Sequence, residues 1–525
     1  MNNDHIETLD KAIELFWNFE LTECENLLSN EKTKVPLFSL LYTDISFIKA
    51  VLTETKEDMS EASKRISECK SLARSLQLSQ KPLYLKLEKE EKKSKDSNTK
   101  DGADSSNYVK AEYLISKLIY AETLVMKAII EFKAQNNLKA GLAFRKSWKQ
   151  YSQAFELVKT LPTTFPIYKH ILSCAYYGVG FFHFLVSVVP PQYIWLVEGI
   201  GFKGNRMEGL KEIQLSSDSN GIRSNMAKIA IILLNVFFFE DYNTPEPLIK
   251  ELMTKYENGS LIYYMSGAIL RKQGKIKESS VSYQRSYDTS GQLKQLQLFV
   301  DSELGYNEFL NLNWEAASVH LAKFLNETTS SGFKAFVAYQ LGCCYDMLGK
   351  KEEARATFKS LEPWVRKGYD FDDFSQKKAA RYLKQKDGWS MFDQLYIQAS
   401  LLNEAHQFQR SYEYIKQALA IGNLTKEESA VAEYLGGANC QQLGQREEAR
   451  RHYQQSIANE KSLSYDHFCI PYSYIGLAEI AFADDKKSDA KAFVKKAKGY
   501  NSTPYDFPSV LDWRTRKLLQ LLGEF

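Results

Sequence analysis

The sequence predicts an all-α fold of repeated helical hairpins, preceded by a less regular helical half. Two observations predict it: one spacing of small, aromatic and glycine residues recurs in the C-terminal half, and no stretch shows sustained strand alternation. The 525 residues exceed the size at which single hydrophobic cores usually stop growing. The length therefore favours several domains or one extended repeat array.

Charge and cysteine usage exclude several classes of function. The 68 basic and 65 acidic residues give a net charge of +3, which provides no electrostatic case for nucleic acid as a partner. The seven cysteines are odd in number and scattered, and no CxxC occurs, so a reducing compartment is favoured over a secreted disulfide framework. The polar N-terminus has no apolar region, and we expect no signal peptide.

The N-terminal half is predicted to be helical, with one break. Apolar residues follow helical spacing in five stretches. These are residues 9–28, 38–52, 62–76, 108–132 and 143–158. Residues 86–107 interrupt the pattern, because they hold mixed charge, Ser, Asp and Gly with almost nothing apolar, and they are interpreted as a disordered insertion.

Two apolar stretches raise the question of a membrane. Residues 176–201 are rich in aromatics, but Pro190-Pro191 and Glu198 interrupt them. Residues 227–239 are shorter than the roughly 20 residues that a spanning helix needs. Buried core helices are the favoured interpretation of both, and association with a membrane surface stays open.

One pattern recurs three times in the C-terminal half. It consists of a small residue, an apolar or aromatic residue, a glycine, a second small residue and an aromatic residue. Its copies are Gly267, Leu270, Gly274, Ser279 and Tyr283; Gly342, Tyr345, Gly349, Ala354 and Phe358; and Gly437, Cys440, Gly444, Ala449 and Tyr453.

This spacing has a direct physical meaning. Small residues such as Gly342 and Ala354 allow two antiparallel helices to approach closely, and Phe358 fills the space beside them. Gly349 is placed to end the first helix, since glycine tolerates the left-handed cap conformation. The pattern is the helix–turn–helix repeat of about 34 residues described for tetratricopeptide units. With degenerate copies, about six units are expected to form an α-solenoid, which exceeds the roughly three needed for a continuous core.

The predicted organisation has five parts. They are helical hairpins at 1–85, the charged insertion at 86–107, a helical middle region at 108–250, the repeats at 251–503 and a C-terminal capping helix within 504–525.

The middle region resembles a known family, the tetratricopeptide repeat protein 39 and fungal inclusion body clearance proteins. The resemblance depends on residues 177–191, with Gly178, Gly180 and Pro190-Pro191, and on residues 201–210. Asn205 stands where the family usually has Asp. The opening hairpin and the C-terminal repeats also look like the family's.

The resemblance implies a non-enzymatic protein that binds partners, with no catalytic residue and no cofactor. It further implies clearance of protein inclusions or lipid homeostasis as the process, and a link to the mitochondrial outer membrane. We expect a cytoplasmic protein, with the nucleus, the mitochondrial outer membrane and lipid droplets as alternatives.

Several motifs could carry chemistry, but a purely structural role is the favoured interpretation of each. Residues 199–204 form a literal GxGxxG, yet no alternating strands surround it, so a tight loop is favoured over a phosphate site. His183 is interpreted as a core histidine and Cys343-Cys344 as buried thiols. Residues 370–374 (DFDDF) are interpreted as an acidic-aromatic linker loop, with docking of a basic partner as the alternative.

The concave face of the repeat array is the predicted binding surface. Its candidate residues lie on the first helix of each repeat, and tyrosines among polar neighbours suit recognition of an extended peptide or a helix. They are Tyr264, Arg271, Tyr339, Asp346, Tyr434 and Gln441. Whether the groove is open or filled by the N-terminal half is left undecided.

The sequence also predicts which partners the groove does not take. Repeat domains that clamp chaperone carboxylates resemble one another in carrying an Asn in the groove. The matching positions in this sequence hold Ala268, Cys343 and Ala438, so no such clamp is expected. The leading hypothesis is a protein-binding scaffold. The alternative is a lipid-handling protein at a membrane or lipid-droplet surface that uses residues 176–201.

Overall fold

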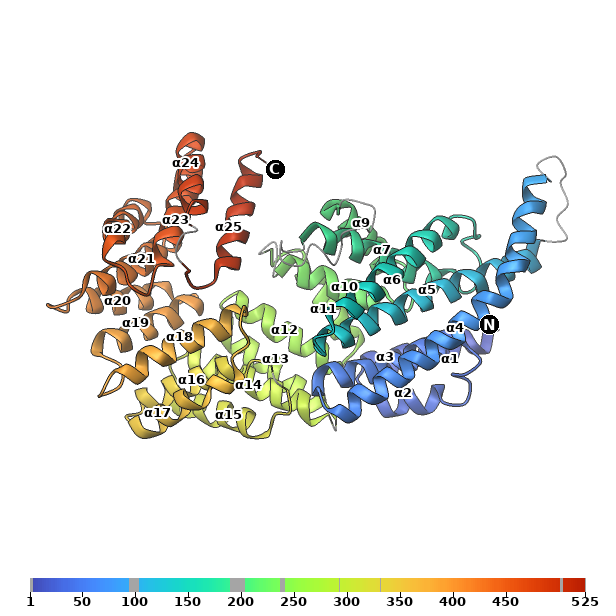
Figure 1. The fold of residues 1–525 in the computed structure, drawn as a ribbon, viewed down its shortest axis with the longest axis horizontal. Coiled ribbons are helices and arrows are strands. Elements are labelled where there is room, and N and C mark those ends of the chain that lie inside the picture. Colours follow the sequence, from blue (N-terminus) through green and yellow to red (C-terminus); the bar gives the residue numbers. More distant parts are fainter. Residues whose placement is uncertain are drawn as a thin grey trace. The chain divides into compact units, whose positions relative to one another are not determined.

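The computed structural model describes residues 3–93, 103–188, 204–236, 241–291, 293–330, 332–500 and 504–524. Within these ranges the chain forms 24 α-helices and two 3-10 helices, and no strand occurs (Figure 1). The prediction of an all-helical fold is confirmed. Contacts between Cα atoms divide the chain into two compact units, residues 1–262 with 288–295, and residues 263–287 with 296–525. The five-part division predicted above is finer than these two units.

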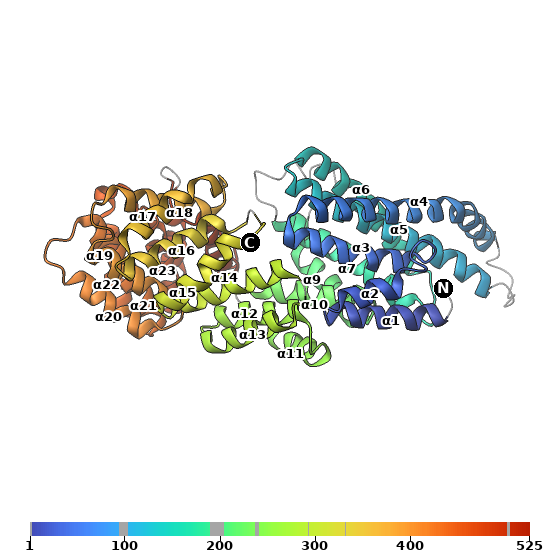
Figure 2. The same cartoon turned by 90° about the horizontal axis from the view of Figure 1, so that it is seen from below.

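The first unit contains the N-terminal helices. They are α1 (Asn3–Trp17), α2 (Leu21–Leu28), α3 (Pro36–Thr53), α4 (Lys56–Lys93), α5 (Ala103–Lys133), α6 (Asn137–Val158), α7 (Tyr168–Val188), α9 (Arg206–Asp218), α10 (Ser224–Leu234) and α11 (Pro245–Lys255). Neighbours along the chain pack as antiparallel pairs, as α4 with α5 and α7 with α9 show (Figure 2).

The helices of the second unit follow the same arrangement of stacked pairs, and the first residues of α12 belong to the first unit. They are α12 (Ser260–Lys272), α13 (Ile276–Thr289), α14 (Lys294–Leu310), α15 (Trp314–Glu327), α16 (Lys334–Met347), α17 (Lys351–Ser360), η3 (Glu362–Trp364), α18 (Asp370–Lys384), α19 (Met391–Glu404), α20 (Phe408–Leu419), α21 (Lys426–Gln442), α22 (Arg446–Ala458), η4 (Glu460–Ser462), α23 (Cys469–Ala483), α24 (Lys487–Lys498) and α25 (Pro508–Leu521).

The glycines of the repeat pattern lie where the two helices of a hairpin touch. A β-carbon added at Gly342 would lie 2.7 Å from the ring of Phe358, and one added at Gly437 would lie 2.7 Å from the ring of Tyr453. The rings of Phe358 and Tyr453 are nearly fully buried. The aromatic residue therefore fills the space that glycine leaves, as the spacing predicted.

The glycine between the paired helices takes a left-handed conformation. Gly274, Gly349 and Gly444 have φ of 74°, 75° and 76°. The first unit uses the same turn with another residue, since Phe19 has φ of 65° between α1 and α2. In that hairpin the Cys24 thiol donates to the carbonyl of Ala12 over 3.2 Å. The N-terminal hairpin thus follows the repeat frame without its glycines.

In two segments the structure differs from what the sequence predicted. Helices α4 and α5 extend into both ends of the predicted insertion at 86–107, and residues 94–102 lie outside the described residues. The segment 370–374 is not a loop, because it forms the first turns of α18. Its acidic side chains begin the helix, where negative charge is favoured by the helix dipole.

Candidate functional site: an aromatic cavity in the second unit

The second unit contains a cavity of about 330 Å³, and half of the residues that line it are aromatic. Phe371 is 48% exposed, so this lining reaches the protein surface. All of the lining residues belong to the second unit. The twelve aromatic ones are Tyr306, Phe309, Phe336, Tyr339, Phe371, Phe374, Trp389, Phe392, Tyr396, Tyr434, Phe468 and Phe507.

Helical spacing brings these rings together. Phe336 and Tyr339 on α16 are three residues apart and stack with centroids 6.3 Å apart. Phe371 and Phe374 repeat this spacing on α18, and the ring of Phe374 lies 5.3 Å from that of Tyr339. Residues three or four apart share one face of a helix, so each helix presents a pair of rings to the cavity.

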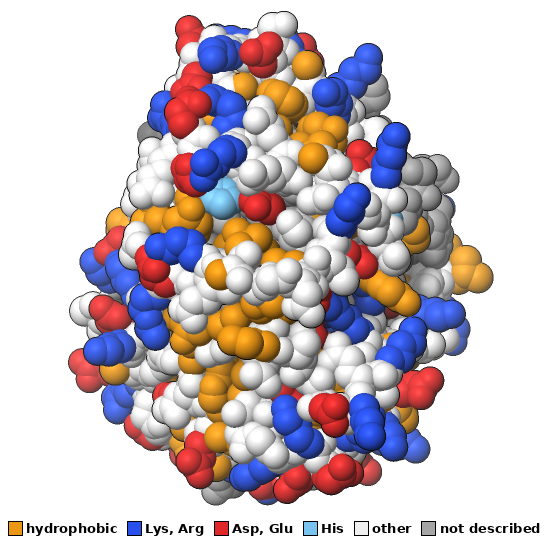
Figure 3. All heavy atoms as spheres, turned by 90° about the vertical axis from the view of Figure 1, so that its left-hand side faces the viewer, with side chains coloured by type: hydrophobic (Ala, Val, Ile, Leu, Met, Phe, Trp, Pro, Cys, Tyr) orange, Lys and Arg blue, Asp and Glu red, His pale blue; other side chains and the backbone are white. Residues whose placement is uncertain are grey.

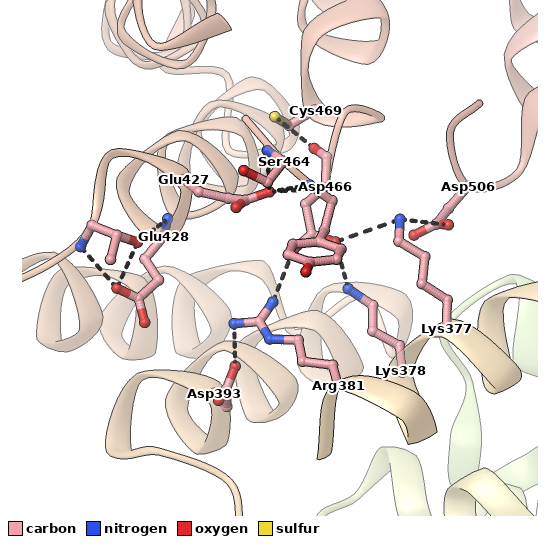
Figure 4. A network of polar contacts seen from close by, with 12 residues as sticks. Lys377, Lys378, Arg381, Asp393, Glu427, Glu428, Ser464, Asp466, Cys469 and Asp506 are labelled. Carbon is pink, nitrogen blue, oxygen red and sulfur yellow. Dashed lines mark hydrogen bonds and ion pairs between the residues drawn. The ribbon is translucent and has the colours of Figure 1, made fainter. Parts of the chain in front are cut away.

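A cluster of basic side chains on α18 meets a buried carboxylate at the wall of the cavity (Figure 4). Lys378 Nζ lies 2.7 Å from Asp466 Oδ1, and Arg381 Nη1 lies 2.9 Å from Oδ2. Lys377 Nζ is farther away, at 3.8 Å. Burial alone would raise the pKa of Asp466, but these three cations outweigh it and lower the pKa to about 2.

Further acids neutralise the remaining positive charge. Arg381 Nη2 donates to Asp393 Oδ1 over 2.8 Å, and Lys377 Nζ donates to Asp506 Oδ1 over 3.0 Å. Each of these three cations on α18 is thus within ion-pair distance of an acid. The cavity therefore offers aromatic surface bordered by charges that already have partners.

Two of the six predicted groove residues line the cavity. Tyr339 on α16 and Tyr434 on α21 both contribute to its wall, although Tyr339 is itself buried. The structure places these two first-helix tyrosines, 95 positions apart in the sequence, at one cavity. The concave face stays a prediction for the binding surface.

Tyr264 and Arg271 take part in a separate cluster that joins α12 to α14. The hydroxyl of Tyr264 donates to Glu303 Oε1 over 2.8 Å, and the Arg271 guanidinium pairs with the same carboxylate. The guanidinium also lies 4.8 Å from the centre of the Tyr306 ring. Neither predicted residue lines the cavity.

Asp346 and Gln441 also bind neighbouring helices rather than facing open space. Asp346 is buried, and its carboxylate accepts hydrogen bonds from Tyr382 at 2.9 Å and from Lys351 at 2.7 Å. Gln441 donates to Glu479 on α23 over 2.8 Å. The helix face on which the repeat frame places these residues carries bonds that connect one repeat to the next.

The carboxylate-clamp positions are occupied by small or buried residues. Cys343 is fully buried, and Ala268 and Ala438 are partly buried. These positions offer no amide to a ligand, and the absence of chaperone-clamp binding stays a prediction.

Sequence reasoning missed the charged residues of the cavity wall. Lys378, Arg381 and Asp466 lie outside the repeat pattern, and only tertiary structure brings the loop before α23 to α18. One signal was available, because the DFDDF segment at 370–374 was singled out. The segment is predicted to be an acidic-aromatic linker loop, whereas its two phenylalanines line the cavity from within α18.

The other motifs offer no second site among the described residues. Among the residues that the structure describes, no group of three or more His, Cys, Asp or Glu is placed to hold a metal ion. His183 Nδ1 lies 2.5 Å from Glu212 Oε2, and all seven cysteines are buried thiols. The GxGxxG motif lies outside the described residues apart from Gly204. Asn205 caps α9, since its Oδ1 accepts from the Glu208 amide over 3.1 Å.

Among the described residues, two helices are long and apolar enough to cross a membrane, α3 and residues 168–187 of α7. In both helices more than half of the apolar stretch is buried inside the protein, and no side chain of α3 or of residues 168–187 is exposed. Buried core helices can have the same length and apolar composition, so these two helices are weak evidence for a membrane span. The apolar segment predicted at 176–201 continues beyond Val188, and its residues 189–201 lie outside the described residues.

The first unit buries its own charge cluster, away from any solvent access. Arg223 Nη1 lies 2.6 Å from Asp44 Oδ2, and Arg223 Nε lies 2.6 Å from Glu122 Oε2. All three side chains are only about 6% exposed. Burial raises the pKa of Asp44 to about 6, although Arg223 opposes the shift. These residues connect α3, α5 and the start of α10 and offer no open surface to a ligand.

On the face of the molecule that Figure 3 shows, neither basic nor acidic side chains form a large patch. On the end of the molecule where α19–α22 lie, basic and acidic side chains are interspersed around hydrophobic ones (Figure 3). This agrees with the near balance of charge in the sequence and gives no basic patch on that face.

Comparison with known proteins identifies relatives at the level of the family. A family model described as Iml2/Tetratricopeptide repeat protein 39 matches residues 10–396. Among solved structures, the yeast protein Tom70 is 12% identical, with a TM-score of 0.30, over 95% of this chain and 100% of that chain. IFIT1, in a monomeric mutant form with Gppp-AAAA, is 11% identical, with a TM-score of 0.32, over 87% of this chain and 95% of that chain.

Proposed function

Because the chain belongs to the Iml2/Tetratricopeptide repeat protein 39 family, we propose that it is a non-enzymatic scaffold that binds protein partners through the aromatic cavity of its repeats. The observation that carries the proposal is the cavity itself, with twelve aromatic side chains around about 330 Å³. Buried aromatic pockets are where protein interfaces concentrate their binding free energy.

The finer role follows the family. We propose that the partners belong to clearance of protein inclusions or to lipid homeostasis, in the cytoplasm or at the surface of mitochondria or lipid droplets. The alternative of direct lipid handling through residues 176–201 has less support, because the described part of that segment packs inside the first unit.

Site-specific photo-crosslinking in cells tests the proposal. A photo-reactive amino acid replaces Phe371, which lines the cavity and is 48% exposed, and in a matched control it replaces Val319, which is 65% exposed and does not line the cavity. We expect proteins to crosslink at position 371 and not at position 319.

A second variant decides whether the cavity itself is responsible. Ser400 lines the cavity, and Ser400→Phe would fill part of it. Crosslinking at position 371 should then fall, while the circular dichroism and thermal melting stay those of a folded helical protein. Equal crosslinking at the two positions, or crosslinking that survives Ser400→Phe, would show that the cavity is not the binding site.

A further inference from the structure

The segment that leads into α25 and includes its first two residues, 504–509, lies across the aromatic wall of the cavity; we call it the strap. The ring of Phe507 lies 5.2 Å from the rings of both Phe371 and Phe374 on α18. Its carbonyl accepts a hydrogen bond from the hydroxyl of Tyr472 over 2.8 Å. At the far end, Ser509 donates to Asp370. The strap thus covers part of the surface that the proposed function assigns to a partner.

The conformation of the strap is unfavourable in two respects. Phe507 has φ of 56° and ψ of 50°, a left-handed conformation that bulky residues rarely adopt, and it precedes Pro508, which restricts it further. The Asp506 side chain is only 9% exposed, and its Oδ2 has no hydrogen-bond partner. Backbone strain clusters at ligand-binding and switch regions, and an unsatisfied buried oxygen is rare in native structures.

The cations of α18 show which chemistry the strap satisfies. Lys378 and Arg381 bind Asp466 directly, at 2.7 and 2.9 Å. Lys377 has its near contact with Asp506, at 3.0 Å, and stands 3.8 Å from Asp466. Lys377 would therefore be the least well paired of the three cations if Asp506 moved away.

We propose that the strap is an intramolecular competitor, and that the partner it excludes presents an acidic residue followed directly by an aromatic one. In this arrangement the partner's carboxylate would bind Lys377 and its ring would pack on Phe371 and Phe374, as Asp506 and Phe507 do in the chain itself. This inference rests on the proposed function and adds both the chemistry of the partner and a control on access.

Fluorescence anisotropy with the full-length protein tests the proposal. The probe is a fluorescein-labelled synthetic peptide with the sequence of residues 503–510, TPYDFPSV, and the control probe is TPYNAPSV. We expect weak binding of the first probe to the wild type, binding at least tenfold tighter to Phe507→Ala, and no binding of the control probe. The double variant Phe507→Ala with Lys377→Gln should lose the gain.

A control variant outside the strap and a second substitution within the strap complete the test. Val510 follows the strap and is 44% exposed, so Val510→Ala should bind the probe as the wild type does. If Phe507→Ala melts at a lower temperature than the assay allows, Asp506→Asn replaces it, with a smaller gain of a few-fold. Binding that is unchanged or weaker in the strap variants would overturn the proposal.

The two proposals can fail separately. If the probe does not bind strap variants but proteins still crosslink at position 371, the cavity is a binding site and the strap is only part of its wall. If the probe binds as expected but nothing crosslinks at position 371 in cells, the strap competes for a site that cellular proteins do not use.

Discussion

Asp44 in the first unit and Asp466 in the second are both buried carboxylates beside arginine, yet their proton affinities move in opposite directions. Burial raises the pKa of Asp44 to about 6, because Arg223 is one cation shared with a second acid, Glu122. The same burial cost at Asp466 is outweighed by Lys378, Lys377 and Arg381, and its pKa falls to about 2. The number of cations per buried acid decides the sign.

This difference distinguishes a structural cluster from one at a binding surface. The first cluster is fully enclosed and short of positive charge, so removing its one cation leaves two buried acids without compensation. In the second, three cations lie within 4 Å of Asp466 at the wall of the cavity, so two remain beside it when one is lost. The following experiments compare the two directly.

The largest effect is expected from Arg223→Met. Removing the only cation of a buried ionic cluster should lower the free energy of unfolding by about 3–5 kcal/mol. The matched change Lys378→Met, which leaves Lys377 and Arg381 beside Asp466, should cost only about 1–2 kcal/mol. Urea denaturation followed by circular dichroism measures both. Similar losses in the two variants would show that the count of cations does not matter.

Cysteine labelling can report which cluster has opened. Cys174 is buried beside the first cluster, and the thiol of Cys469 donates to the carbonyl of Asp466 over 3.2 Å. Burial raises the pKa of both thiols, so both should react slowly in the native protein. Arg223→Met should accelerate labelling of Cys174 more than that of Cys469, as measured by mass spectrometry of the labelled peptides. The reverse order would contradict this assignment.

The dependence of stability on pH should differ between the clusters. The raised pKa of Asp44 means that its stabilising contribution is greatest below pH 3.8 and is lost as pH rises through 6. The lowered pKa of Asp466 gives a contribution that is present above pH 3.8 and is lost as pH falls through 2.

Asparagine variants separate these contributions. Between pH 4.5 and 8, the wild type should lose stability relative to Asp44→Asn as pH rises. Over the same range, the difference between the wild type and Asp466→Asn should stay constant, because Asp466 is ionised throughout. A slope for Asp466→Asn, or its absence for Asp44→Asn, would refute the contrast between the two carboxylates.

The smallest effect is expected from a glycine turn that lies outside both clusters. A β-carbon at Gly349 would meet no atom within 4 Å, so Gly349→Ala changes only the preference of the backbone at φ of 75°. We expect a loss of about 1 kcal/mol in the free energy of unfolding. Gly422 also has open space and no left-handed φ, so Gly422→Ala should change stability by less than about 0.5 kcal/mol. Thermal melting of the two variants checks the difference.

The repeat frame was predictable because it depends on local spacing. Gly342, Gly349 and Phe358 meet their predicted roles as a close approach, a left-handed turn and the ring that fills the space. The aromatic cavity was only half predictable. Tyr339 and Tyr434 follow from the frame, but Asp346 and Gln441 share its helix face and bind the next helices instead.

The sequence by itself determined that this chain folds into helical hairpins, since periodicity, small residues at close approaches and left-handed turns act within about 20 neighbouring residues. Tertiary structure alone decided that the strap around Phe507 lies on α18, and that Asp466 has three cations where Asp44 has one. Such contacts join residues far apart in the chain, and no local pattern encodes which buried acid receives which partner.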